Sequence, residues 1–315
     1  MPTVKHLVLS AGAQNGFRTY GALRSLARRG IWDPSDIESV WGVSSGAIVG
    51  AMVILGYEWE WLDDFLMKRP WHDVLGADER VLDMYAEAGL YGQEVVDEVL
   101  GPLLEARGLA RTITLAAFAK ATDVDFHCIA TNMNGDTGFE KVVFDAALTP
   151  DCPLLTAVAG SAAYPMMFKP VRYDGKCLID GGVHAVYPLT EALATGANPE
   201  NTLGIRNHWG QQCTPISDSA NLLDFSSALL SRFWQGTCSS DHLDEPPAGL
   251  REVACLCAPG SWRAIRDAIA DEAERRRLVG LGEADAESAR ITWETTAAPP
   301  RPPLKEMTSE TGEGM

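Results

Sequence analysis

The sequence predicts an α/β protein, in which buried strands alternate with helices. One observation is the apolar run at residues 4–10, which leads through a loop of small residues into a helical segment at 17–29. The second is the β-branched run at 40–43, which enters the turn Gly42-x-Ser44-x-Gly46 and continues into an apolar helix closed by Gly56. Two successive strand–turn–helix units are typical of this class.

The remaining elements follow from periodicity and turn signals. Further strands are expected at 126–132, 141–144, 171–173, 177–179 and 202–205, and Asn134-Gly135 joins the first two as a hairpin. Further helices are expected at 58–67, 94–105, 115–120, 154–163, 220–233 and 262–279. Residues 294–315 are rich in proline at their start and lack apolar periodicity, which predicts a disordered tail after one domain spanning 1–293.

The composition restricts the partners of the chain. With 43 acidic against 26 basic residues, the net charge is −17, which repels nucleic-acid phosphate and anionic bilayers. No apolar run reaches the roughly 18 residues that span a bilayer, and the seven cysteines are odd in number and scattered, as reduced thiols are. We expect a cytoplasmic protein without nucleic-acid partners, whose membrane contacts are transient and local; export as an effector and the oligomeric state stay open.

Two local patterns each have two interpretations. Cys255-x-Cys257 has no second Cys or His pair at matching spacing, so alternation along a strand explains it better than a metal site. Trp59, Trp61 and Trp71 cluster within one segment, either as a lipid-facing lip or as core packing, which we favour. The sequence therefore predicts neither a metal nor a cofactor.

Ser44 is the candidate nucleophile. Gly42 and Gly46 flank it because a sharp strand-to-helix corner brings the backbone close to itself and leaves the serine strained. A helix that begins after Ser44 aims its free N–H groups and its positive dipole end at that side chain. The alternative is a Gly/Ser-rich turn that packs a helix on a strand.

Two other segments place polar groups at strand ends. Asp180 follows the strand at 177–179, and Gly181 and Gly182 allow another backbone or a serine to approach it closely. Its alternative is an ordinary turn acid. The small-residue loop at 11–16 offers backbone N–H donors, either as an oxyanion cradle or as a plain turn.

A Ser–His–Asp triad is the rival arrangement, because His208 and His242 follow Ser44 and Asp180 in the chain order of an α/β-hydrolase. Only about 40 residues precede Ser44, and each parallel crossover needs at least 10–12 residues besides its strands. One strand–helix–strand unit fits there, and not the several expected in that fold. We therefore assign no catalytic role to either histidine.

Four stretches within residues 4–205 together resemble the patatin-like phospholipases. They are 7–23 with Gly12, Gly16 and Gly21; the Gly42-x-Ser44-x-Gly46 elbow with its helix to Gly56-Tyr57; Gly160-Ser161-Ala162-Ala163-Tyr164-Pro165 with Phe168, Pro170 and Val171; and Leu178-Ile179-Asp180-Gly181-Gly182 with Pro188. The resemblance implies a three-layer α/β/α fold with a mostly parallel central sheet. It also implies a Ser–Asp dyad that works without a histidine.

Carried over residue by residue, the resemblance implies that Ser44 is the nucleophile, Asp180 the general base, and Gly12 and Ala13 the oxyanion hole. The implied activity is a phospholipase A-type hydrolysis of fatty acyl esters of glycerophospholipids through an acyl-enzyme. The alternatives are a carboxylesterase or thioesterase on soluble acyl esters, and a lipid-binding protein with weak catalysis.

The chain departs from the family pattern at four positions. Ala11 and Ala13 replace glycines of the family loop, and Asn15 stands where that loop has Arg or Lys. Tyr187 stands where the family often has Asn. An alanine in this loop keeps its backbone N–H directed at the oxyanion only if its φ is negative. A negative φ is therefore the condition for an intact oxyanion hole.

Overall fold

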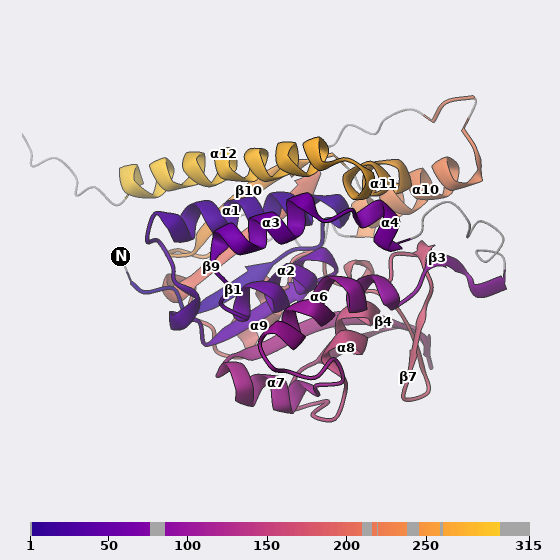
Figure 1. Cartoon of the computed structure of the whole chain (residues 1–315), viewed down its shortest axis with the longest axis horizontal. Helices are drawn as coiled ribbons and strands as arrows, with labels where there is room; N and C mark the ends of the chain where they lie inside the picture. Colours follow the sequence, from indigo (N-terminus) through magenta and orange to yellow (C-terminus); the bar gives the residue numbers. More distant parts are fainter. Residues whose placement is uncertain are drawn as a thin grey trace, which may run out of the picture.

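The computed structural model describes residues 2–75, 86–209, 216–218, 220–237, 246–258 and 261–296. Its centre is an eight-stranded mixed sheet, which confirms the α/β class (Figure 1). The strands of this sheet are β1 (His6–Leu9), β2 (Ser39–Val43), β4 (Asp125–Gly135), β5 (Gly138–Phe144), β7 (Val171–Tyr173), β8 (Lys176–Asp180), β9 (Thr202–Trp209) and β10 (Arg251–Cys257). Their order is β10-β9-β1-β2-β4-β8-β7, with β5 paired to β4. The neighbours from β10 to β4 are parallel, and β5, β7 and β8 pair antiparallel.

The helices form two unequal layers. They are α1 (Gly16–Arg28), α2 (Ser45–Ile54), α3 (Trp59–Lys68), α4 (Trp71–Leu75), α6 (Glu94–Ala106), α7 (Leu115–Thr122), α8 (Leu154–Ser161), α9 (Leu189–Ala194), α10 (Leu222–Thr237), α11 (Trp262–Ala270) and α12 (Glu272–Thr296). Successive strand residues face opposite sides of the sheet, so Leu7 and Leu9 pack in the main core with α1 and α2, whereas Val8 packs with α9. The second face is therefore covered by a much shorter helix.

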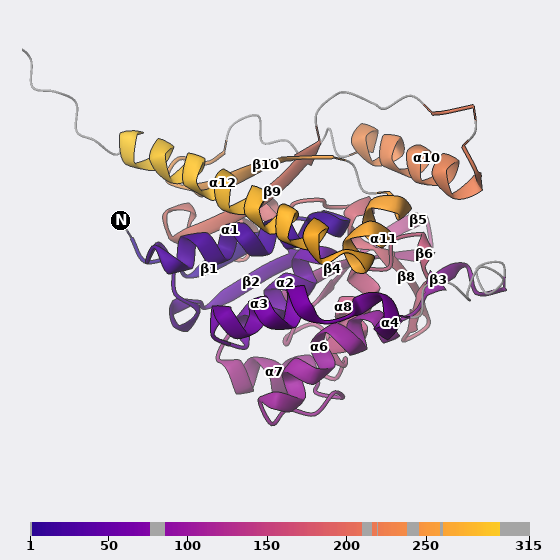
Figure 2. The same ribbon diagram turned by 45° about the horizontal axis from the view of Figure 1, so that its top comes forward.

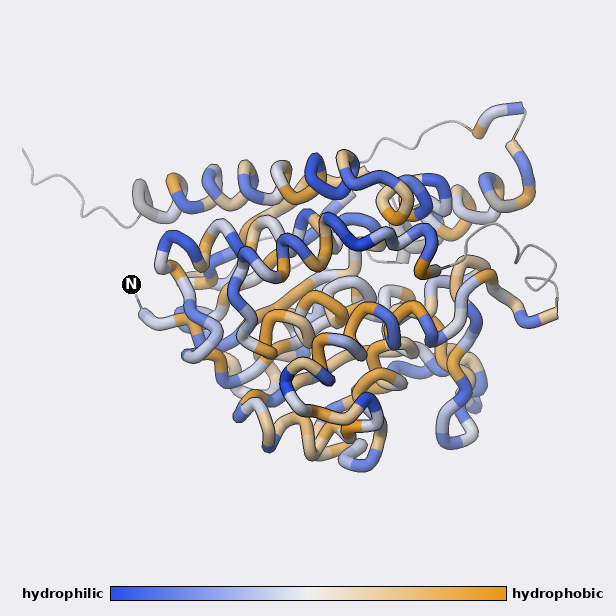
Figure 3. The backbone as a smooth tube through the Cα atoms, viewed as in Figure 1, coloured by the Kyte–Doolittle hydropathy of each residue, from blue (hydrophilic) through white to orange (hydrophobic). Residues whose placement is uncertain are grey.

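The helix α2 is buried on all sides, which explains why its sequence lacks an amphipathic pattern. Figure 3 shows its hydrophobic turns at the centre of the molecule, whereas α12 carries mixed hydropathy along its length. This last helix lies along α1 on the outside of the main layer (Figure 2). Gly282 allows the two backbones to approach closely, because it has no side chain. A Cβ at this position would overlap the Arg18 carbonyl group of α1.

The long strand β4 brings the ends of two other strands together. On one side, β2 pairs with it as far as Val43 opposite Ile129. The antiparallel strand β8 takes the adjoining place, with Asp180 opposite Ala130. Since Ile129 and Ala130 are consecutive, the carboxyl ends of β2 and β8 meet head to head.

The structure differs from the sequence-based expectations at several places. The hairpin of β4 and β5 is present, but its turn is at Asp136 and Thr137, because Asn134 and Gly135 still belong to β4. The single helix expected at 262–279 is wrong, because Asp271 ends α11 in an extended conformation and its side chain accepts a hydrogen bond from the Ala273 N–H, which caps α12. The helix α12 continues to Thr296, three residues beyond the expected end of the domain at 293; residues 297–315 of the expected tail lie outside the described residues. A second small sheet, of β3 (Gly89–Tyr91) and β6 (Met166–Phe168), was not foreseen.

The two ambiguous patterns are resolved by burial. Cys255 and Cys257 are buried and alternate with the exposed Leu256 along β10, as a strand predicts. Trp71 is buried and Trp59 packs against the main core, so core packing is correct for both. It is wrong for Trp61, which is exposed and stacks on Tyr57. Among the described residues, no helix is both long and apolar enough to cross a membrane.

Candidate active site

Ser44 lies at the corner where β2 ends and α2 begins. Its backbone has φ 55° and ψ −124°, a positive φ that non-glycine residues rarely adopt. Two glycines make this corner possible. A Cβ on Gly42 would lie 2.6 Å from the Cα of Ala47, and a Cβ on Gly46 would lie 2.6 Å from the Ser10 carbonyl oxygen.

Asp180 lies directly against Ser44 because the carboxyl ends of β2 and β8 meet on β4. The Ser44 hydroxyl donates a hydrogen bond of 2.6 Å to Oδ2 of Asp180. The other carboxylate oxygen, Oδ1, accepts from the Gly182 N–H at 2.7 Å, and the Thr131 hydroxyl donates to the Asp180 carbonyl at 3.0 Å. Gly181 has no room for a side chain, since a Cβ there would overlap the Ile129 carbonyl. The glycine after Asp180 therefore allows the backbone there to pack closely against β4.

The environment of Asp180 changes its basicity. Its side chain is buried, and this burial raises the pKa of its carboxyl group to about 6. The hydrogen bonds from Ser44 and Gly182 oppose that increase only in part. Near pH 7 the group is mainly a carboxylate, and it is a stronger base than an aspartate in water.

The structure places no histidine between the two members of this pair. The Ser44 hydroxyl donates to Asp180 without an intermediary, which is incompatible with a relay through an imidazole. His208 is on β9, and His242 lies outside the described residues.

Ser161 fixes the elbow from the neighbouring helix α8. Its hydroxyl accepts a hydrogen bond of 3.0 Å from the Ser44 N–H and donates one of 2.6 Å to the Ile129 carbonyl. Sequence reasoning included Ser161 in a family motif but gave it no role. The signal that marks it is a serine in an otherwise apolar, buried helix.

The loop after β1 has its carbonyl groups turned into the protein. Asn15 donates its side-chain N–H to the Gly12 carbonyl at 2.9 Å, and the buried Asn207 donates to the Ala11 carbonyl at 3.3 Å. Within the described part of the chain, the N–H groups of Gly12 and Ala13 donate to no protein acceptor. Both residues line the same small cavity as the Ser–Asp pair. Asn207 is far away in sequence, and nothing in its local pattern predicts this role.

Ala13 adopts φ 50°, so the negative φ expected for an intact oxyanion hole is not found. The expected condition is nevertheless too strict, because in the described structure the Ala13 N–H donates to no protein acceptor and Ala13 lines the cavity of the Ser–Asp pair. A small residue reaches the left-handed region at a cost of about 1–2 kcal/mol, and the surrounding contacts hold it there. Gly12 has φ −175°, outside the left-handed region, so no positive φ requires a glycine there. The glycine at position 12 is needed for another reason: a Cβ there would lie 2.5 Å from Nδ2 of Asn207.

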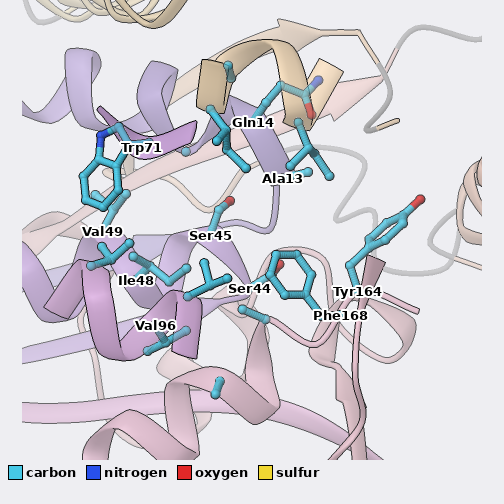
Figure 4. A pocket seen from close by; sticks show the side chains of 18 of the residues that line it. Ala13, Gln14, Ser44, Ser45, Ile48, Val49, Trp71, Val96, Tyr164 and Phe168 are labelled. Atoms are coloured by element: carbon cyan, nitrogen blue, oxygen red, sulfur yellow. The ribbon is translucent and has the colours of Figure 1, made fainter. Parts of the chain in front are cut away.

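A cavity of about 180 Å³ extends from Ser44 into the main helical layer. The cavity is lined along α2 by Ser45, Ile48, Val49 and Met52, so at 1.5 Å per residue it follows this helix for about 10 Å. Figure 4 shows Trp71 and Val49 on one side of the cavity, Ser44 near its middle and Tyr164 on the other side. The walls are almost wholly apolar, and they come from α1, α2, α3, α4, α6, α8 and α11.

The fold and this site define a patatin-like protein, and the comparisons agree. The family model described as patatin-like phospholipase matches residues 7–193, so the chain belongs to that family of lipid acyl hydrolases. The chain is 28% identical over 190 residues to a probable lipid hydrolase of Invertebrate iridescent virus 6, covering 60% of this chain and 63% of that protein. It is 25% identical over 195 residues to an uncharacterised protein of Acanthamoeba polyphaga mimivirus, covering 59% and 61%.

A solved structure also has this fold. VipD from Legionella pneumophila superimposes with a TM-score of 0.50 at 14% sequence identity, covering 92% of this chain and 67% of that one. This match supports the α/β fold with a mostly parallel sheet. The chain spans about six tenths of the length of both viral relatives.

Proposed function

We propose that the chain hydrolyses fatty acyl esters of glycerophospholipids as a phospholipase A-type enzyme, with Ser44 as nucleophile and Asp180 as general base. The observation that carries this proposal is the 2.6 Å hydrogen bond from a strained serine to a buried carboxylate, at the end of an apolar cavity. A serine hydroxyl attacks an ester only when a base accepts its proton, and Asp180 is within reach to do so.

The proton steps balance with these two residues alone. As Ser44 Oγ attacks the ester carbonyl carbon, its proton passes to Asp180 Oδ2. The tetrahedral intermediate collapses, and the same carboxyl group returns the proton to the departing alcohol oxygen. In the second half, Asp180 takes a proton from water as that water attacks the acyl-enzyme. It then returns this proton to Ser44 Oγ as the bond to the acyl carbon breaks and the fatty acid leaves.

The negative charge of the tetrahedral oxygen needs donors, which Gly12 and Ala13 supply. Their N–H groups are free of protein acceptors, and the carbonyls of Ala11 and Gly12 are held away by Asn207 and Asn15. Backbone donors fixed before the reaction cost no reorganisation when charge develops, and one such donor typically contributes about 100–1000-fold in rate.

The apolar cavity supports an acyl chain as the group attached to the carbonyl. An apolar cavity of about 150 Å³ binds an aromatic hydrocarbon ring, so about 180 Å³ beside Ser44 accepts a substantial length of acyl chain. The stretch of the cavity along α2 is apolar, and Lys169, the charged residue among its described lining residues, forms an ion pair with Glu87. This lining favours the acyl chain along α2 and the alcohol part of the substrate outside the cavity.

The test is release of fatty acid from phosphatidylcholine, measured by mass spectrometry. We expect turnover by the native chain, and loss of at least about 1000-fold in Ser44→Ala and Asp180→Asn, because each removes a reacting group. Ser288→Ala, on an exposed position of α12, is the matched control and keeps full activity. Equal turnover by native chain and Ser44→Ala would contradict the proposal.

A further inference from the structure

Two polar side chains interrupt the apolar wall of the cavity of about 180 Å³ beside Ser44, which we call the acyl cavity. Gln14 follows Ala13 in the loop after β1, and Ser45 follows Ser44 at the start of α2. Both line the acyl cavity, and they expose only 7% and 9% of their surface. Polar groups are thus buried in an apolar wall directly beside the reacting groups.

Neither of these groups is paired within the part of the chain that the structure describes. Oε1 of Gln14 and Oγ of Ser45 are buried and form no hydrogen bond with the protein. Most buried polar groups in folded proteins are hydrogen-bonded, because an unpaired one has lost its contacts with water and gained nothing in return. Two unpaired groups at one place in an apolar wall indicate a binding site for a polar group of the ligand.

The two side chains lie in the same part of the acyl cavity. A Cβ on Gly16 would lie 2.9 Å from Cβ of Ser45 and 3.5 Å from its Oγ, so Ser45 lies against the backbone two residues after Gln14. In Figure 4 the Ser45 hydroxyl points to the side of the cavity on which Gln14 and Ala13 lie. A single small group bound at this place is therefore positioned to contact both side chains.

A hydroxyl group is the smallest neutral group that satisfies both side chains. It donates its hydrogen to Oε1 of Gln14, and its oxygen accepts the hydrogen of the Ser45 hydroxyl. A carbonyl oxygen, including that of the reacting ester, has no hydrogen to donate and leaves Gln14 unpaired. A charged group is costly to bury in apolar surroundings.

The position of the pair assigns this hydroxyl to the acyl part of the substrate. The acyl cavity is lined by both residues, whereas the described lining of the small cavity around Asp180 includes neither. Each of the two residues directly follows one that holds the reacting carbonyl group in the proposed mechanism, Ala13 or Ser44. The hydroxyl is therefore expected close to the ester carbonyl and not at the far end of the acyl chain.

We propose that the chain prefers esters whose acyl group carries a hydroxyl at the α or β carbon, and that Gln14 and Ser45 bind this hydroxyl. The inference rests on the proposed function, because it takes the cavity as the site of the acyl group, and it names the class of acyl chain. Two hydrogen bonds to buried partners favour the hydroxylated ester by about 10–100-fold in kcat/KM. The ester without the hydroxyl leaves both buried groups unpaired, which is why such sites discriminate against it.

The first experiment compares four substrates on the native chain. They are the methyl esters of decanoic acid and of its α-hydroxy, β-hydroxy and ω-hydroxy derivatives. We expect the α or the β isomer to exceed methyl decanoate by about 10–100-fold in kcat/KM, and the ω isomer to show no advantage. Equal values for all four esters overturn the proposal, and they are the result expected if a water molecule alone bridges Gln14 and Ser45.

The second experiment removes the two polar groups. Gln14→Leu and Ser45→Ala should each lose most of the preference, measured within each variant as the ratio of kcat/KM for the preferred and the unsubstituted ester. Gln93→Leu is the matched control and keeps the native ratio, because Gln93 lines the same cavity but its amide donates to Asp97. Removal of an unpaired buried group should leave the unfolding temperature unchanged or higher. A lower unfolding temperature with an unchanged ratio indicates a structural role and overturns the proposal.

Binding separates this proposal from the proposed function. Ser44→Ala forms no acyl-enzyme, and by calorimetry it should bind the preferred hydroxylated methyl ester about 10–100-fold more tightly than methyl decanoate. If the native chain hydrolyses neither these esters nor phosphatidylcholine, the proposed function fails, and this binding ratio still decides the hydroxyl site. A preference for the glycerol ester of decanoic acid over methyl decanoate that Gln14→Leu abolishes places the hydroxyl on the alcohol side and also overturns the proposal.

Discussion

The pH dependence of Asp180 links catalysis and stability in one prediction. The ordinary pKa of an aspartate is 3.8, and burial raises that of Asp180 to about 6. Only the carboxylate accepts the proton of Ser44, so kcat/KM should increase with pH around a midpoint of about 6. At pH 5 about a tenth of the molecules carry the carboxylate, and the rate should be about tenfold below its plateau.

The same group affects the free energy of unfolding. A carboxyl group whose pKa is raised by folding binds its proton more tightly in the folded chain, so it lowers stability as pH rises from about 4 to about 6. The difference between these pKa values corresponds to about 3 kcal/mol, which is lost in full above pH 6. Asp180→Asn cannot titrate, so its stability relative to the native chain should increase by about this amount between pH 4 and pH 7.

Both quantities are measured on the same two proteins. The rate is followed with a soluble fluorogenic ester between pH 4.5 and 8, and stability by urea unfolding over pH 4 to 7. Unfolding of the native chain without substrate shows whether the protein stays folded across this pH range. A rate that is flat down to pH 4.5, together with parallel stability profiles of native chain and Asp180→Asn, would refute a buried carboxylate base.

Three further substitutions test the elements around the pair. Asn15→Ala frees the Gly12 carbonyl to turn, and kcat should fall about 10–100-fold with little change in KM, as measured by steady-state kinetics; a change in KM alone would contradict this. Gly46→Ala forces a Cβ against backbone carbonyls and should lower the free energy of unfolding by at least about 2 kcal/mol, whereas Gly280→Ala on α12, where a Cβ meets nothing within 4 Å, should raise it slightly. Val49→Phe enlarges a side chain that lines the cavity away from Ser44 and should abolish hydrolysis of long-chain esters while butyryl esters still react; an equal loss for both would show that acyl chains bind elsewhere.

The strand–turn–helix units and the residues at their corners could be read from the sequence because their signals are local. Gly42 and Gly46 mark the elbow, and apolar runs mark β1 and β2. The family motifs then located Asp180. These are cases in which a few neighbouring residues decide the backbone conformation.

The contacts that complete the site depend on residues far apart in the chain. Ser44 and Asp180 meet because two strands abut on β4, a register that no local pattern encodes. Asn207 reaches the loop after β1 only because β9 pairs with β1. The break at Asp271 was missed because an aspartate within a helical pattern is usually a surface residue, and here it caps a second helix.

The positive φ of Ala13 was not foreseen for a different reason. Alanine carries no local signal for a left-handed conformation, and it adopts one here only because the loop is held by contacts from elsewhere. Such strain is visible only in the structure. It concerns the backbone of a residue that the proposed mechanism uses directly.

The most direct test of the central claim is intact-mass analysis after incubation with a fluorophosphonate probe, which traps an activated serine. We expect one adduct on the native chain, no adduct on Ser44→Ala, and a strongly slowed reaction of Asp180→Asn. Thermal unfolding of the variants serves as the control for folding. A native chain that stays unmodified, or an adduct that persists in Ser44→Ala, would contradict a Ser44–Asp180 dyad.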